Sequence, residues 1–194
     1  LREHGLSDDA IVMVSIGSDL HRKGVDRSIR AIASIRRTSS HDACLLVIGG
    51  GGERSMRLLT ARLGVGRHVR LLGTRQDVGR HLAAADVLLH PARLEATGTA
   101  IVEGIAAGIP VVTTSVCGYA FHVTDASAGV VLDSPFDQRA MNEACLSLCD
   151  EGRRRAMADH ARRYAANTDL YGRAARGADL IEEWSRTKLV PRHP

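Results

Sequence analysis

Glu95 and Glu103 are the residues of this sequence whose spacing has the clearest chemical meaning. Seven residues separate them, and Gly98, Thr99 and Ala100 are among those seven. Apolar residues recur at helical spacing after Thr99, so we expect a helix to begin there with its first amide groups unpaired. Unpaired amides at a helix start attract an anion, and each carboxylate can accept hydrogen bonds from neighbouring hydroxyls. The pattern fits a sugar–diphosphate–ribose ligand, although a capping Glu95 and a solvent-facing Glu103 would also explain it.

A pair of cations follows the first apolar run of the chain. Arg22 and Lys23 come after Gly17 and Ser18, and Gly24 then permits a sharp turn. Arginine forms paired hydrogen bonds with phosphate oxygens and lysine supplies a point charge, so the two suit a diphosphate. A solvated surface turn explains the pair equally well.

A run of four glycines at 49–52 follows the next apolar run and precedes Glu53. Glycine permits close approach of a ligand to the backbone, so a nucleotide could pass over this loop. No lysine and Ser/Thr of a Walker motif follow it. A tight turn without ligand contact explains the glycines nearly as well.

The elements that must position these residues are short apolar runs alternating with helical patterns. Several runs are continuous rather than alternating, as in strands covered on both faces. Strands are expected at 11–17, 43–49, 68–73, 87–91, 110–114 and 129–132, and helices at 25–37, 53–63, 77–85 and 99–107. Three more helices are expected at 136–149, 153–167 and 170–184. The order predicts an α/β fold, a Rossmann-like doubly wound parallel sheet with a helical C-terminal tail, in one domain over residues 1–194.

The loops that carry the chemistry share one end of this expected sheet. In an open α/β sheet, ligands bind beyond the carboxyl ends of the strands, where helix N-termini also point. The loops at 17–24, 49–53, 73–77 and 91–99 take that position and concentrate glycine and charge. We therefore expect the cations of the first and the acid of the last to face one crevice.

Composition limits the classes of function. Hydrophobic residues make up 44% and charged residues 25%, as in ordinary soluble domains, and no run approaches the roughly 20 apolar residues of a membrane span. The net charge of +4 suits an anionic ligand or a membrane surface but is too small to indicate nucleic acid. The four cysteines show no CxxC spacing, which favours reduced thiols, fits a cytoplasmic location and predicts no metal site.

The motif around the two glutamates resembles that of a known family. It consists of His90-Pro91, Glu95, Gly98, Glu103-Gly104 and the run Ala107-Gly108-Ile109-Pro110-Val111-Val112. In these positions the sequence resembles glycosyltransferase family 4, group 1, whose members have the GT-B fold of two Rossmann-like domains. The likeness extends from about Gly17 to Ile181, and within the family it is greatest to enzymes that add glucose to the lipopolysaccharide core.

The resemblance implies roles for individual residues. Arg22 and Lys23 resemble the catalytic pair that neutralises the departing UDP diphosphate, Glu95 the acid that holds hydroxyls of the donor hexose, and Glu103 the acid that holds the ribose. Arg75 resembles the residue beside the uracil, and the amides of Gly98, Thr99 and Ala100 are implied to contact phosphate and sugar. The substrate-binding residues implied by the resemblance are Gly17, Ser18, Arg75, Gly98, Thr99, Ala100 and Glu103. His90, His122 and Cys117 are interpreted as structural or cleft-lining, and no protein nucleophile is expected.

The implied activity is transfer of a hexose, glucose for preference, from a UDP-sugar to a lipopolysaccharide core or related glycan, with retention at the anomeric carbon. No metal or cofactor is expected. The implied partners are the UDP-sugar, a glycolipid acceptor and an N-terminal acceptor domain that these 194 residues do not include. The implied location is cytoplasmic, with room for peripheral contact with the inner membrane. We expect the chain to bind UDP-sugar weakly and to transfer nothing alone.

Two other readings fit the sequence. One is a UDP-sugar epimerase of the same GT-B architecture, which would share the nucleotide-binding half; the Arg22-Lys23 pair and the two spaced glutamates argue against it. The other is a non-catalytic module that binds a nucleotide or docks on anionic lipid through the basic residues of 153–163. For those arginines a solvated helix face is the simpler interpretation.

Overall fold

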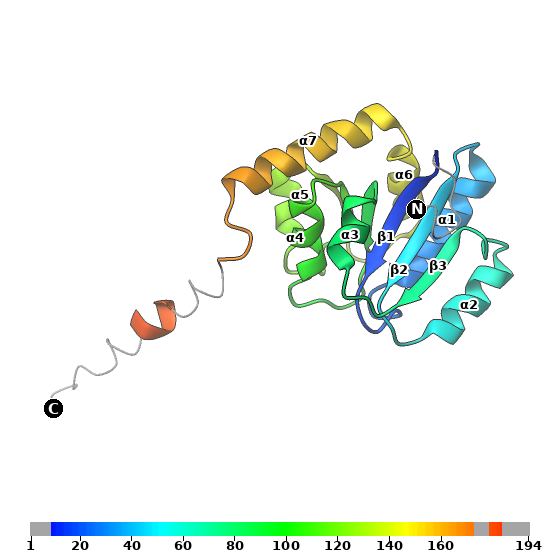
Figure 1. The fold of residues 1–194 in the computed structure, drawn as a ribbon, viewed down its shortest axis with the longest axis horizontal. Coiled ribbons are helices and arrows are strands. Elements are labelled where there is room, and N and C mark those ends of the chain that lie inside the picture. Colours follow the sequence, from blue (N-terminus) through cyan, green and yellow to red (C-terminus); the bar gives the residue numbers. More distant parts are fainter. Residues whose placement is uncertain (1–8, 173–178, 184–194) are drawn as a thin grey trace.

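Six parallel strands form the centre of the structure, a computed structural model that describes residues 9–172 and 179–183 (Figure 1). The strands are β1 (Ile11–Ile16), β2 (Ala43–Ile48), β3 (Val69–Gly73), β4 (Val87–His90), β5 (Val111–Thr114) and β6 (Gly129–Leu132). Their order across the sheet is β3-β2-β1-β4-β5-β6. Both faces are covered, which is why the central strands are continuous apolar runs. The predicted α/β fold and its doubly wound parallel sheet are confirmed.

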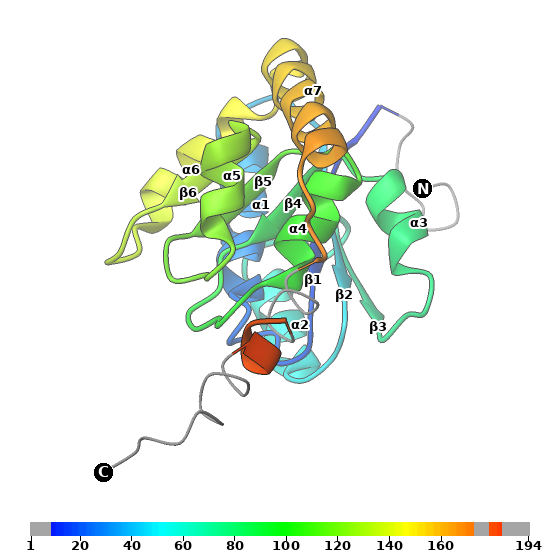
Figure 2. The ribbon, with the colours of Figure 1, turned by 90° about the vertical axis from the view of Figure 1, so that its left-hand side faces the viewer.

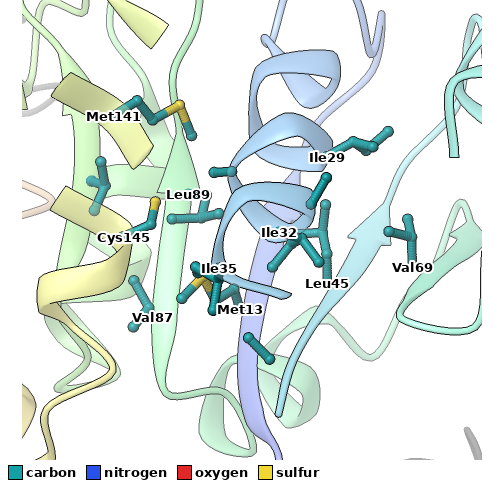
Figure 3. Close-up of a cluster of buried hydrophobic side chains, with 14 of the residues drawn as sticks. Met13, Ile29, Ile32, Ile35, Leu45, Val69, Val87, Leu89, Met141 and Cys145 are labelled. Carbon is teal, nitrogen blue, oxygen red and sulfur yellow. The ribbon is translucent and has the colours of Figure 1, made fainter. Parts of the chain in front are cut away.

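One face of the sheet is covered by α1 (Val25–Thr38), α2 (Glu53–Arg62) and α6 (Gln138–Ser147). Ile29, Ile32 and Ile35 recur along α1 at helical spacing and are all 0% exposed. They pack onto the apolar side chains of β1, β2 and β4 (Figure 3). Burying each isoleucine contributes roughly 1.5–3 kcal/mol, so this face holds α1 against the sheet.

The other face is covered by α3 (Val78–Ala83), α4 (Thr99–Ala106) and α5 (Ala120–Ala126). The last long helix, α7 (Glu151–Asn167), lies across α4 and α5 (Figures 1 and 2). Its contacts with them close the second apolar core, in which Ala161 is fully buried.

Two helical expectations differ from the structure. The helix α5 was not expected, because its seven residues include β-branched and aromatic side chains and show no long apolar period. The helix expected at 170–184 does not begin at Leu170, since Leu170–Gly172 form a bend and turn in which the Asp169 carboxylate accepts the Gly172 amide at 2.7 Å. Residues 179–183 are helical, and the rest of that range lies outside the described residues.

The chain direction across the sheet reverses between β1 and β4. From β1 the chain runs outward to β2 and β3, then returns beside β1 and continues through β4 to β6. At such a switch point the loops after the two neighbouring strands lead to helices on opposite faces, and in open α/β sheets this is where ligands bind. The loops after β1 and β4 are those that carry Arg22, Lys23 and Glu95.

Candidate functional site

The loop after β1 is folded so that Arg22 and Lys23 face the loop after β4, the strand beside β1 in the sheet. Asp19 has a φ of 57°, and its carboxylate accepts the amide of Arg22 at 3.1 Å. Gly24 has a φ of 73° and lies so close to the backbone of Pro91 that a Cβ would fall 2.0 Å from the Pro91 carbonyl oxygen. Gly17 leaves room for the stem of Lys23, since a Cβ there would be 2.8 Å from Lys23 Cε. The glycines thus determine where the ammonium group lies.

The loop after β4 is held on both sides by backbone hydrogen bonds. The amide of Arg93 donates to the carbonyl of Arg22 at 2.8 Å, which joins it to the first loop. On its other side, the amide of Gly118 donates to the Glu95 carbonyl at 3.3 Å, next to a bridge between Glu95 and Cys117. The position of Glu95 is therefore fixed by the loops after β1 and β5 as well as by its own loop after β4.

The carboxylate of Glu95 meets the two predicted cations. Lys23 Nζ forms an ion pair with Glu95 Oε2, and Arg22 Nη1 lies 3.5 Å from the same oxygen. The side chains of Lys23 and Glu95 are only 14% and 10% exposed, so the pair is largely shielded from solvent. Burial raises the pKa of the Glu95 carboxyl, but the Lys23 ammonium and its hydrogen bond outweigh this and hold the pKa below its ordinary value.

The imidazole of His90 also lies close to the Glu95 carboxylate, in addition to Lys23 and Arg22. Its side chain is 1% exposed, and its Nε2 is 3.7 Å from Glu95 Oε2. Burial lowers the pKa of the imidazole to about 4, and the Lys23 charge acts in the same direction. At neutral pH the ring is therefore uncharged, and the local charge comes from Arg22, Lys23 and Glu95.

Helix α4 begins directly after this cluster. Gly98, with a φ of 94°, precedes Thr99, and among the residues that the structure describes no side chain caps the helix. Its first amides thus lack intrahelical acceptors and carry the positive end of the helix dipole. Glu103 follows one turn later and is half-buried, and within the described part of the chain its carboxylate makes no hydrogen bond or ion pair.

The other predicted binding residues lie around this centre at different distances from it. Gly17 is in the same loop as Lys23, and Ser18 beside it is exposed. Arg75 follows β3, the edge strand, and forms a bidentate ion pair with Asp77 through Nε and Nη2, each at 2.9 Å. The guanidinium lowers the pKa of Asp77 to about 2. The structure therefore brings Arg22, Lys23, Glu95 and the start of α4 together, whereas Arg75 lies two strands from β1.

The glycine run has a structural function. Gly50 and Gly51 accept the amides of Asp19 and Leu20 at 2.8 and 2.9 Å through their carbonyl oxygens. A Cβ on Gly49 would lie 2.0 Å from the Gly17 carbonyl oxygen, so only glycine permits this contact. The loop after β2 thus supports the loop that presents Arg22 and Lys23.

Two features of the site were missed from the sequence. Arg93 forms a bidentate ion pair with Asp26 at 2.7 and 2.8 Å and donates to the carbonyl of His21, which ties the loop after β4 to the start of α1. His90 was interpreted as structural or cleft-lining, although its ring faces Glu95. Residue spacing predicts neither contact. Arg93 and Asp26 lie 67 positions apart in the sequence, and the contact of His90 with Glu95 depends on the direction in which its ring points.

The sequence matches the family model of the glycosyl transferases group 1 over residues 1–167. The chain belongs to the group 1 glycosyl transferases. The predicted membership of glycosyltransferase family 4 is thereby confirmed. Because the match covers β1 to α7, it includes every residue predicted for the site.

Comparison with two curated relatives shows what share of a full-length group 1 glycosyl transferase this chain covers. It is 42% identical over 181 residues to the lipopolysaccharide glucosyltransferase WaaG of Escherichia coli strain K12, covering 93% of this chain and 48% of that protein. It is 33% identical over 188 residues to a GDP-mannose-dependent phosphatidylinositol monomannoside mannosyltransferase of Mycolicibacterium smegmatis, covering 92% and 48%. The chain therefore spans about half the length of these relatives.

Solved structures agree on the fold of this group 1 transferase. The crystal structure of WaaG, a glycosyltransferase involved in lipopolysaccharide biosynthesis, superposes with a TM-score of 0.87 at 41% identity, covering 93% of this chain and 49% of that one. HepE of Anabaena in complex with UDP-glucose has a TM-score of 0.78 at 22% identity, covering 94% and 51%, which is a likeness of fold. None of the described helices is both long enough and apolar enough to cross a membrane.

Proposed function

We propose that this chain is the donor-binding domain of a retaining hexosyltransferase that transfers glucose from UDP-glucose to a lipopolysaccharide core or related glycan. The observation that carries the proposal is the meeting of Arg22, Lys23 and Glu95 beside the uncapped start of α4, in a chain 42% identical to a lipopolysaccharide glucosyltransferase. Family membership favours transfer over the epimerase reading.

In the proposed mechanism the diphosphate rests on the first amides of α4 and takes Arg22 and Lys23 as counter-charges. These groups stabilise the charge that develops on the departing UDP, which lowers the barrier for cleavage of the sugar–phosphate bond. The acceptor hydroxyl then attacks from the same face, so the anomeric configuration is retained. Glu95 holds hydroxyls of the hexose, Glu103 holds the ribose, and Gly17, Ser18 and Arg75 line the remainder of the nucleotide site.

A titration of the chain with nucleotides tests this proposal. UDP, UDP-glucose, UDP-galactose, UDP-GlcNAc and GDP-mannose would be compared by NMR, the last because a relative at 33% identity takes that donor by name. We expect UDP-glucose to bind, and Lys23→Ala and Glu103→Ala each to weaken UDP binding about tenfold, the effect of one lost charge-assisted contact of roughly 1.4 kcal/mol.

A matched control is Arg139→Ala, which removes an 84%-exposed cation on α6 and should leave nucleotide affinity unchanged. If Lys23→Ala and Glu103→Ala also leave UDP affinity unchanged, the nucleotide does not occupy this crevice and the proposal is wrong. A preference for GDP-mannose over every UDP-sugar would overturn the choice of donor.

A further inference from the structure

The buried imidazole of His90 has no role in the mechanism proposed so far. Its Nε2 is 3.7 Å from Glu95 Oε2, beyond hydrogen-bond length, and no other described residue supplies a partner for this atom. A polar atom that is buried without a partner destabilises a fold, and such atoms are rare in native proteins. Its retention beside the site is explained if the atom gains a partner in another state of the protein.

The protonation of the ring decides what partner it can take. Burial and the nearby Lys23 ammonium lower the pKa of His90 to about 4, so the ring is neutral at physiological pH. A neutral imidazole donates from one nitrogen and accepts at the other. With its proton on Nε2 it can donate a hydrogen bond to a carboxylate without adding charge to the site.

The proposed function requires the Lys23–Glu95 ion pair to open. The single ammonium group of Lys23 cannot neutralise the diphosphate and keep its full ion pair with Glu95 at the same time. Once Lys23 turns to the phosphate, the 10%-exposed carboxylate of Glu95 needs another donor. Arg22, whose Nη1 lies 3.5 Å from Glu95 Oε2, binds the same diphosphate in the proposed mechanism and cannot replace Lys23.

Gly98 lies beside both the ring and the carboxylate and places no side chain against them. A Cβ on it would lie 3.0 Å from Ile101 Cδ1, 3.4 Å from Glu95 Cγ and 3.6 Å from His90 Nε2. A small rotation of the Glu95 side chain would bring Oε2 from 3.7 Å to an ordinary hydrogen-bond length of about 2.9 Å. The backbone of His90 is meanwhile held, because its carbonyl accepts the hydroxyl of Thr113 at 3.0 Å.

We propose that His90 is a positioning residue that takes over Glu95 from Lys23 when donor binds, donating from Nε2 to the carboxylate so that it stays directed at the hexose. The proposal rests on the proposed function and deepens it. Bare UDP also draws Lys23 away, but water then fills the hexose position and can donate a hydrogen bond to the Glu95 carboxylate. Only the bound hexose displaces that water and leaves the carboxylate dependent on His90. His90 should therefore affect binding of UDP-glucose and not of UDP.

The test compares the affinities of UDP and UDP-glucose in four variants of the chain. His90→Leu and His90→Asn remove a donor at the Nε2 position, and His90→Gln places an amide nitrogen close to it. We expect Leu and Asn to weaken UDP-glucose binding about fivefold to tenfold with UDP affinity unchanged, and Gln to restore most of the loss. Arg139→Ala, which removes an exposed cation on α6 and leaves the His90 ring and its backbone contacts intact, should change neither affinity.

Equal losses for UDP and UDP-glucose in His90→Leu, or a failure of Gln to restore binding, would overturn the positioning role. Because two of the His90 variants are polar, a folding defect in His90→Leu leaves the comparison of Asn with Gln intact. The proposed function fails separately, when Lys23→Ala and Glu103→Ala leave UDP binding unchanged. If those two changes weaken UDP binding and the His90 variants do not alter the ratio of affinities, only the role of His90 is wrong.

Discussion

At the scale of the residue, the ion pair between Lys23 and Glu95 is needed in the free chain to neutralise two charges, yet it must open for Lys23 to bind a diphosphate. The pair neutralises two largely buried charges, either of which would be costly to leave without the other. The same pair competes with a diphosphate for the lysine, and the carboxylate repels the phosphate oxygens. Glu95 should thus weaken binding of the nucleotide diphosphate and strengthen binding of the hexose.

The variant Glu95→Gln separates these two effects. Loss of the carboxylate charge frees Lys23 for the diphosphate, so we expect UDP to bind several-fold more tightly than to the parent chain. UDP-glucose should gain less, or bind more weakly, because an amide is a poorer acceptor for the hexose hydroxyls. Isothermal titration of both ligands measures the difference. Weaker UDP binding would mean that Glu95 does not compete for Lys23.

His90 also predicts a dependence of stability on pH. Its pKa is lowered from 6.5 to about 4 in the folded chain, so below pH 6.5 the unfolded state binds a proton that the folded state does not. Stability is therefore lost as the pH falls from about 6.5 to about 4, with a slope of up to about 1.4 kcal/mol per pH unit. Denaturant unfolding of the parent chain and His90→Gln across this range should give curves that converge on acidification. Parallel curves would show that the ring is not buried in a neutral form.

The residues proposed for the site were singled out from the sequence, but the contacts among them were not predicted. Arg22, Lys23, Glu95 and Glu103 were singled out by residue type, spacing and family resemblance. The alternatives of a solvated turn and a capping acid could be set aside only when the structure showed Lys23 and Glu95 in contact across 72 residues of chain. The Arg93–Asp26 pair was missed for the same reason: its geometry arises only when β4 inserts beside β1.

At the scale of the element, the site is assembled from loops packed backbone to backbone. The chain at Gly24 touches Pro91, and the amide of Arg93 reaches the Arg22 carbonyl at 2.8 Å. Such contacts leave no room for side chains, which explains why glycines occupy the turn positions. They fix the distance between the cations and the start of α4 more firmly than the side-chain ion pair can.

Gly24→Ala tests this packing. The new Cβ would lie 2.0 Å from the Pro91 carbonyl oxygen on a residue with a φ of 73°, so the two loops must separate. We expect a loss of about 2 kcal/mol or more in the free energy of unfolding, together with weaker UDP binding. The control is Gly79→Ala, in α3 with nothing within 4 Å of the added atom, which should stabilise the chain by about 0.5–1 kcal/mol. Similar destabilisation by both changes would contradict the account.

The strands were predicted almost residue for residue, because a strand buried on both faces is a continuous apolar run that few other elements produce. The long helices α1 and α7 were predicted to within two residues at each end. α5 was missed because seven residues are too few to show a helical period, and its place is determined by packing against β6, α4 and α7. Short elements are stabilised by tertiary contacts that no local pattern reveals.

At the scale of the whole molecule, the basic residues of α7 mostly serve the fold. Arg154 donates to the carbonyls of Leu148 and Cys149 after α6 and lies 3.5 Å from Asp86. Arg162 pairs with Asp159 and Arg155 with Glu151. The acidic partners offset part of the positive charge of α7, so these contacts favour the solvated-face interpretation over a lipid-docking module.

Vesicle binding separates those two interpretations. We expect the chain to remain in the supernatant when sedimented with vesicles of anionic phospholipid at physiological salt, while UDP still binds to it. Vesicles of neutral lipid provide the control for nonspecific adsorption. Sedimentation with the anionic vesicles alone, lost on Arg153→Ala with Arg163→Ala, would instead support docking through α7.

The relation of this chain to a complete reaction gives the last prediction. Transfer needs an acceptor hydroxyl held against the donor, and we propose that a second domain holds it, since the chain spans about half the length of the relatives it matches. In the proposed function, the described residues supply counter-charges and hydroxyl acceptors for a donor at the carboxyl ends of β1 and β4. We therefore expect the purified chain to bind UDP-glucose and to release no glucosylated product when given radiolabelled donor and lipopolysaccharide core acceptor. Product formation above that of Lys23→Ala would show that these residues also hold the acceptor, and the division into donor and acceptor domains would be wrong.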